Sequence, residues 1–159
     1  MFNIPIFPKV KIVVNKNNIY TKTFDNITFG GRMYNGSFVT LLNTPLRDIN
    51  GLYIEDKDHM NSPMHHLKFT FETPLKQQSS VRGDNAISVD EYDYRLAIPR
   101  NGSYATVQTI GDDIKNIERK IEYGNRMRGK TMQCEIASDY NSTDFSLQYI
   151  TTKFRMSWS

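Results

Sequence analysis

The sequence feature that most constrains the fold is a repeated alternation of apolar and polar residues in short runs. In the run HLKFTFE at 66–72, single polar residues separate Leu67, Phe69 and Phe71. Alternate side chains of a β-strand lie on opposite faces, so this period of two predicts a strand with one buried face. Similar β-prone runs, bounded by Gly, Pro, Asn or Asp, occur at 9–14, 19–24, 27–29, 32–34, 37–42, 52–55, 92–98, 131–137 and 144–158.

Short polar segments between these runs predict how the strands connect. Asn35-Gly36 is the strongest hairpin signal in the sequence, because both residue types tolerate the positive φ that two-residue turns require. Residues 15–18 predict a hairpin between the runs on either side of them, and residues 138–142 predict a terminal hairpin formed by the last two runs. The polar segment QQSSVRGDN at 77–85 is predicted to be a long exposed loop.

One segment departs from the period of two. Between 109 and 124, four isoleucines (Ile110, Ile114, Ile117 and Ile121) are spaced by four, three and four residues, which is the spacing of one face of a helix. We therefore predict one α-helix at about 110–123. The predicted fold class is mainly β: a single domain over 1–159 that forms a β-sandwich or a partly closed barrel with this one helix.

Size and composition set the broad class of the protein. The chain has 159 residues, and its aromatic content of 12% supplies enough large side chains for a buried core. Cys134 is the single cysteine, so no intrachain disulfide can form, and a small buried side chain is its expected role. No stretch approaches the roughly 20 apolar residues that span a bilayer, so no membrane contact is expected.

No pattern of reactive side chains indicates catalysis. A histidine- and acid-rich segment at 56–66 has no recognised metal-ligand spacing, and it is expected to be a polar loop, with a metal-dependent hydrolase as a minor alternative. Asp90, Glu91 and Asp93 are expected to be solvated, which does not separate their pKa values as acid–base catalysis requires. The tripeptide at 82–84 (RGD) is expected to be a turn. We therefore predict no enzyme activity, no catalytic residue, no cofactor and no metal site.

The most charged stretch holds six basic and two acidic residues between 115 and 130. Basic side chains on one surface can contact phosphates, and a solvated helix face is the alternative. The candidate nucleic-acid contacts are Lys115, Arg119, Lys120, Arg126, Arg128 and Lys130.

Two strings carry a resemblance to a known group of proteins. EYDYRLAIPRNG (91–102) resembles a strand-plus-turn pattern of tail and head–tail stabilisation proteins from podovirus-like and crAss-like phages. Residues 126–158 resemble the closing β-hairpin of phage tail-tube and nozzle β-domains. The matching positions are Arg95, Ile98, Pro99 and Arg100 in the first string, and Arg126, Arg128, Gly129, Lys130, Phe145, Leu147, Phe154 and Arg155 in the second.

This resemblance implies a virion structural protein that is assembled in the host cytoplasm: a head–tail connector, ring or tail component. Its expected partners are portal, tail or neighbouring ring subunits in a cyclic homo-oligomer, with packaged DNA as a further contact. The apolar residues 1–8 are expected to be a docking arm. The expected contact residues are Phe2, Ile4, Ile6, Phe7, Arg95, Arg100 and Trp158.

The alternative function is a carbohydrate- or receptor-binding β-sandwich. In that case aromatic side chains would stack on sugar rings, as the ring faces of tyrosine and tryptophan allow. The aromatic candidates are Tyr34, Tyr53, Tyr92, Tyr94 and Trp158.

Overall fold

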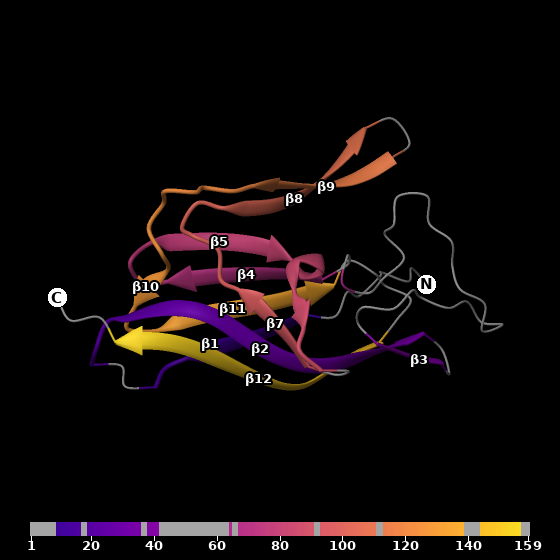
Figure 1. Ribbon diagram of the computed structural model, residues 1–159, viewed down its shortest axis with the longest axis horizontal. Coiled ribbons are helices and arrows are strands. Elements are labelled where there is room, and N and C mark those ends of the chain that lie inside the picture. Colours follow the sequence, from indigo (N-terminus) through magenta and orange to yellow (C-terminus); the bar gives the residue numbers. More distant parts are fainter. Residues whose placement is uncertain are drawn as a thin grey trace, which may run out of the picture.

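The structure is a computed structural model that describes residues 9–16, 19–35, 38–41, 64, 67–90, 93–110, 113–138 and 144–156. Twelve β-strands and a short 3-10 helix follow one another along these segments (Figure 1). The elements are β1 (Lys9–Val14), β2 (Lys22–Asn35), β3 (Phe38–Leu41), β4 (Leu67–Thr73), β5 (Gln77–Arg82), η1 (Gly83–Asn85), β6 (Ile87–Ser88), β7 (Asp93–Ala97), β8 (Tyr104–Ile110), β9 (Asp113–Arg119), β10 (Arg128–Gly129), β11 (Met132–Ser138) and β12 (Asp144–Met156).

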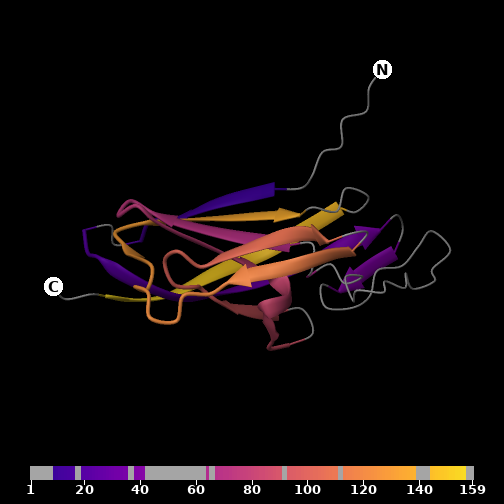
Figure 2. The same ribbon diagram turned by 90° about the horizontal axis from the view of Figure 1, so that it is seen from above.

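The strands form two antiparallel sheets and a separate two-stranded ribbon. The first sheet has the order β1-β11-β4-β5. In the second sheet the long strand β2 pairs with β12 over most of its length, and with β10, β7 and β3, while β6 pairs with β7. Figure 2 shows the two sheets as separate layers. The predicted mainly-β class and its sandwich form are therefore confirmed.

The apolar core lies between the two layers, and the clearest alternation of inward-facing residues is in β4 and β11. β4 and β11 alternate between buried and partly exposed residues, as the period of two predicts. The Phe29 ring of β2 lies 5.0 Å from the Phe69 ring of β4 and 5.7 Å from the Tyr94 ring of β7. The two sheets are thus joined by aromatic contacts at their centre.

One side chain crosses three strands of the second sheet. Tyr149 of β12 pairs with Gly30 of β2, and Gly30 pairs with Asp93 of β7. The Tyr149 hydroxyl donates a hydrogen bond to Asp93 Oδ1. A Cβ atom at residue 30 would lie 2.4 Å from Tyr149 Cε1, so the ring occupies the space that only a glycine leaves open.

A charged side chain is buried at one end of the sandwich. Lys22, the first residue of β2, is fully buried. Its Nζ donates hydrogen bonds to the carbonyl oxygens of Lys130 (2.5 Å) and Tyr20 (3.4 Å), and it lies 5.7 Å from the centre of the Phe154 ring. Burial lowers the pKa of Lys22 below its ordinary value, because desolvation disfavours the charged amine.

Two of the predicted hairpins are wrong. Residues 15–18 follow β1, which belongs to the first sheet and pairs with β11, and they precede β2 of the second sheet. The terminal strands β11 and β12 likewise belong to different sheets. In both cases two strands that follow one another in the sequence lie in different sheets. The predicted hairpin at Asn35-Gly36 is confirmed by the pairing of β2 with β3.

The predicted α-helix at about 110–123 is wrong. Residues 104–110 and 113–119 form the antiparallel strands β8 and β9, which project from the sandwich as a ribbon (Figure 1). The spacing of the isoleucines fits a helix, but β-branched residues are less favourable in helices than in strands. The two residues between the paired Ile110 and Asp113 are Gly and Asp, which tight hairpin turns favour.

The predicted exposed loop at 77–85 is also wrong, since residues 77–82 form β5. Ser79 and Ser80 are buried, and their hydroxyls bond to backbone groups. Ser79 Oγ donates to Pro99 O (3.2 Å), and Ser80 Oγ accepts a hydrogen bond from Ala105 N (2.9 Å). Small polar residues therefore occupy this strand because they bind the adjacent segment that leads into β8.

Several predictions fall outside the described residues. These include the strand at 52–55, the docking arm at 1–8 and the histidine-rich segment up to His66, apart from Met64. Over the described residues, no group of three or more His, Cys, Asp or Glu side chains is placed to hold a metal ion. In the same part of the chain, none of the helices is long and apolar enough to cross a bilayer.

Candidate functional site

Three chain segments meet beside the edge of the first sheet and enclose a cavity. They are the end of β5 with η1, the end of β7 with residues 98–103, and residues 120–126, which follow β9. The middle segment is fixed to β5 by backbone hydrogen bonds: Ser80 N donates to Ser103 O, and Gly102 N donates to Gln78 O, both at 2.8 Å. These hydrogen bonds hold the segment against the edge strand β5.

The segment 120–126 is held against residues 100–103 by further hydrogen bonds. Arg100 Nη1 donates to Gly124 O (2.7 Å), and Asn101 N donates to Asn125 O (2.9 Å). Ile121 N donates to Ser103 Oγ at 3.1 Å. Gly124 permits this close approach, because a Cβ atom there would lie 3.2 Å from the carbonyl oxygen of Asn101.

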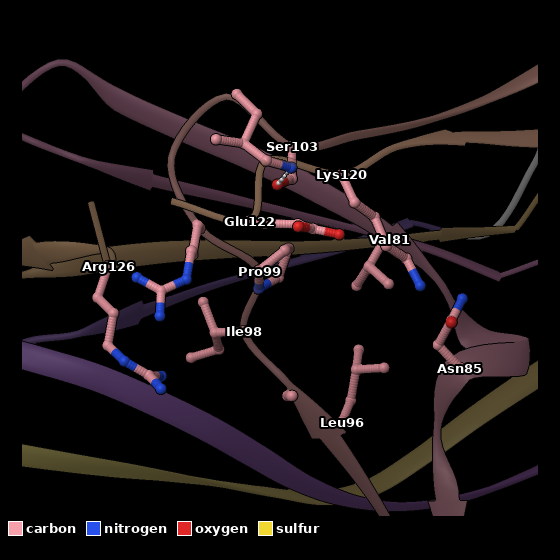
Figure 3. Close-up of a pocket in the computed structure, with 12 residues that line it drawn as sticks. Val81, Asn85, Leu96, Ile98, Pro99, Ser103, Lys120, Glu122 and Arg126 are labelled. Atoms are coloured by element: carbon pink, nitrogen blue, oxygen red, sulfur yellow. Dashed lines mark hydrogen bonds between the residues drawn. The ribbon is translucent and has the colours of Figure 1, made fainter. Parts of the chain in front are cut away.

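The cavity has a volume of about 380 Å³ and an apolar floor (Figure 3). Figure 3 shows Leu96, Ile98 and Val81 in the middle of the cavity, with Arg126 and Asn85 at opposite ends. These three apolar side chains also belong to the core of the sandwich. The complete lining is Val81, Asn85, Leu96, Ala97, Ile98, Pro99, Arg100, Ser103, Lys120, Ile121, Glu122 and Arg126.

The charges at the rim are predominantly positive. Arg100, Lys120 and Arg126 carry positive charges, and Glu122 is the acidic side chain of the lining. Arg126 Nη1 lies 3.8 Å from Asp25 Oδ1, but both oxygens of that carboxylate already accept hydrogen bonds from Arg155, at 3.0 and 3.1 Å. The charge of Arg126 is therefore only partly balanced by its neighbours.

An exposed tyrosine stands next to the cavity. Tyr123 lies between Glu122, which lines the cavity, and Gly124, and its side chain is 96% exposed. Tyr123 was not among the predicted contact residues, because the helix predicted at about 110–123 ends at this position. Its position beside Gly124 in a basic stretch could have indicated an exposed contact residue.

The residues expected to contact partners occupy different parts of the molecule. The structure brings Arg100, Lys120 and Arg126 together at the cavity. Arg95 is exposed on β7, where it pairs with Ile87 and lies two residues before the cavity residue Ala97.

The other predicted contacts either lie away from the cavity or fall outside the described residues. Arg119 is exposed at the end of β9, and Lys115 lies within the same strand. Arg128 begins β10, and Lys130 lies beside a second cavity at the end of the sandwich. Phe2, Ile4, Ile6, Phe7 and Trp158 are outside the described residues.

Two side chains considered for chemistry or ligand binding are enclosed in the core. Burial, together with the charge of Glu135, raises the pKa of the Cys134 thiol to about 12, so the nucleophilic thiolate is not formed near neutral pH. Tyr94 is 0% exposed, and its expected role in stacking on a sugar is therefore wrong. Of the other aromatic candidates, Tyr53, Tyr92 and Trp158 lie outside the described residues.

Comparison with protein families gives a match for this chain. The sequence model for the crassvirus muzzle protein C-terminal domain matches residues 6–101, which is more than half of the chain. This region contains β1 to β7 and the Val81–Arg100 part of the cavity. No curated protein and no solved structure matches the chain.

Proposed function

Since the chain belongs to the crassvirus muzzle protein C-terminal domain family, we propose that this phage structural protein is a non-enzymatic tail or head–tail connector component of the virion. The family match over residues 6–101 is the observation that carries the proposal. Such a component acts by binding other virion proteins, among which portal, tail and neighbouring ring subunits are the proposed partners.

Exposed apolar side chains support assembly with neighbouring subunits. Ile19 and Leu75, which are 77% and 59% exposed, lie at an end of the sandwich. Tyr123 is 96% exposed beside the cavity, and Ile87 of β6 is 70% exposed. A cyclic ring needs two different, complementary surfaces on each subunit, and aromatic residues and arginine are enriched where such surfaces meet.

The chain ends and the basic residues supply further proposed contacts. We propose that residues 1–8 dock on a neighbouring subunit through Phe2, Ile4, Ile6 and Phe7, and that Trp158 also contacts a partner. Of the proposed DNA-facing residues, Arg119 and Lys130 are exposed and do not line the cavity, so they are accessible to phosphate groups. A chain lacking residues 1–8 should form smaller or weaker assemblies than the full chain in sedimentation experiments.

Mass spectrometry of purified particles combined with sedimentation of the purified chain tests the proposed function. We expect the chain in the particles and an oligomer of defined size in solution. Leu75→Asp should weaken the oligomer, because a charge at an apolar contact is costly to bury, while Gln148→Asp at an exposed position of β12 should not. A chain that is absent from particles and stays monomeric at high concentration would refute the proposal.

A further inference from the structure

We propose that the cavity between η1, β7 and residues 120–126 receives an acidic, apolar segment of a partner protein in the particle. An aliphatic or aromatic side chain would enter the cavity, and flanking carboxylates would pair with Arg100, Lys120 and Arg126. This inference rests on the proposed function, because it names the chemistry of the partner that such a structural component binds at this site.

The interior of the cavity favours an apolar side chain. Leu96, Ile98 and Val81 supply its floor, and its volume of about 380 Å³ lies at the lower end of the roughly 300–1,000 Å³ typical of ligand sites. The hydrogen bonds of Arg100, Asn101 and Ile121 hold the walls in place before a partner arrives. A preformed apolar cavity loses little free energy to ordering on binding.

The rim favours carboxylates around that side chain. Three cationic side chains and one anionic side chain line the cavity. Arg100 uses one terminal nitrogen for Gly124 O, and a guanidinium has five N–H donors in all, so donors remain for a carboxylate. Lys120 and Arg126 are exposed, and their side chains are able to reach toward an incoming acidic group.

Tyr123 extends the same surface beyond the cavity. A tyrosine that is 96% exposed leaves almost its whole ring in contact with water, and burial against a partner would remove that apolar area from solvent. Tyrosine and arginine are also the side chains that contribute most often to binding hot spots. Tyr123 and Arg126, which lie on the same side of the cavity, should therefore contribute most to binding the partner segment.

A protein segment fits this site better than DNA does. Phosphate contacts need outward-facing basic side chains but make no use of an apolar floor. The combination of an apolar floor and a mixed but mainly positive rim therefore favours acidic peptide over nucleic acid.

Titration of the full chain with a blocked peptide of alternating Glu and Leu, followed by NMR of the backbone amides, tests the proposal. We expect saturable shifts at Ile121, Gly124 and Arg126, and at least about fivefold weaker binding of the matched Gln and Leu peptide. A short DNA duplex is titrated in parallel. The variant Lys120→Gln with Arg126→Gln should weaken peptide binding by about fivefold, whereas Lys16→Gln with Lys153→Gln should leave it unchanged.

Three outcomes would overturn the proposal. The first is an absence of shifts around the cavity at saturating peptide. The second is equal weakening by both double variants, which have the same net charge, because binding would then depend on overall charge alone. The third is tighter binding of the duplex than of the peptide with the same dependence on Lys120 and Arg126. None of these results would refute the proposed function, because that function is tested separately by whether the chain is present in particles and forms an oligomer.

Discussion

The contact between Tyr149 and Gly30 gives the most direct test of the fold. Gly30→Ala would place a Cβ atom 2.4 Å from Cε1 and 2.9 Å from Cζ of the Tyr149 ring. The ring would have to rotate away, which breaks the hydrogen bond from its hydroxyl to Asp93. Overpacking of this kind costs about 1–3 kcal/mol, and loss of glycine flexibility in the unfolded chain returns about 0.5–1 kcal/mol.

The expected net effect of Gly30→Ala is therefore a destabilisation of up to about 2.5 kcal/mol. The sign should reverse when the ring is removed. In a Tyr149→Ala chain, the three atoms nearest to that Cβ are removed, and Gly30→Ala should raise the free energy of unfolding by about 0.5–1 kcal/mol. The predicted coupling between the two residues then equals the cost of the steric contact, about 1–3 kcal/mol.

Urea denaturation of the four chains in this double-mutant cycle, followed by intrinsic fluorescence, measures the coupling. Tyr149→Phe is a matched control, because it keeps the ring over Gly30 and removes only the hydroxyl. Gly30→Ala should remain destabilising in the Tyr149→Phe chain. If Gly30→Ala destabilised the chain equally with and without the ring, steric contact with Tyr149 would not be the reason for the glycine.

Three further predictions concern single residues. Lys76 has a φ of 59° in the turn between β4 and β5, so Lys76→Gly should raise the free energy of unfolding in urea by about 0.5–1 kcal/mol, and a loss of stability would contradict the assigned turn. Cys134, with a pKa of about 12, should resist iodoacetamide at pH 8 in the folded chain and react after unfolding; rapid labelling of the folded chain would contradict its burial. Because burial lowers the pKa of Lys22, the unfolded chain binds more protons between that lowered pKa and 10.5. The free energy of unfolding should therefore rise with pH across this window, and thermal melts should show a smaller rise for Lys22→Met.

Local sequence pattern predicted the strands with a clear period of two, but it did not reliably predict their partners. The alternation of Leu67, Phe69 and Phe71 identified β4, because the period of two is a property of the strand itself. Whether a strand pairs with its neighbour in sequence depends on which sheet buries its apolar face, and residues 15–18 carry no information about that. Ser79 and Ser80 were missed in a similar way, because their burial depends on backbone groups more than 20 residues away.

The candidate site was predictable only as separate residues. Lys120 and Arg126 were selected from the sequence as basic residues for nucleic-acid contact, whereas Arg100 was selected through the phage resemblance as a partner contact. They meet at one cavity because of the hydrogen bonds that join residues 100–103 to 121–125. These long-range contacts become possible once 104–119 forms a ribbon, and the prediction of a helix in that segment hid them.

The buried amine of Lys22 biases one end of the sandwich toward opening. A protonated lysine gains hydration as soon as the strand ends around it separate, so water that enters there stabilises the opened form. Fraying should accordingly begin at this end and leave the aromatic centre around Phe29 closed. Ile19 and Leu75 are exposed at the same end, and a neighbour that covers them would exclude that water. Assembly would then stabilise the end of the sandwich that opens most easily in the isolated chain. Folding of the subunit and formation of the particle would therefore be coupled.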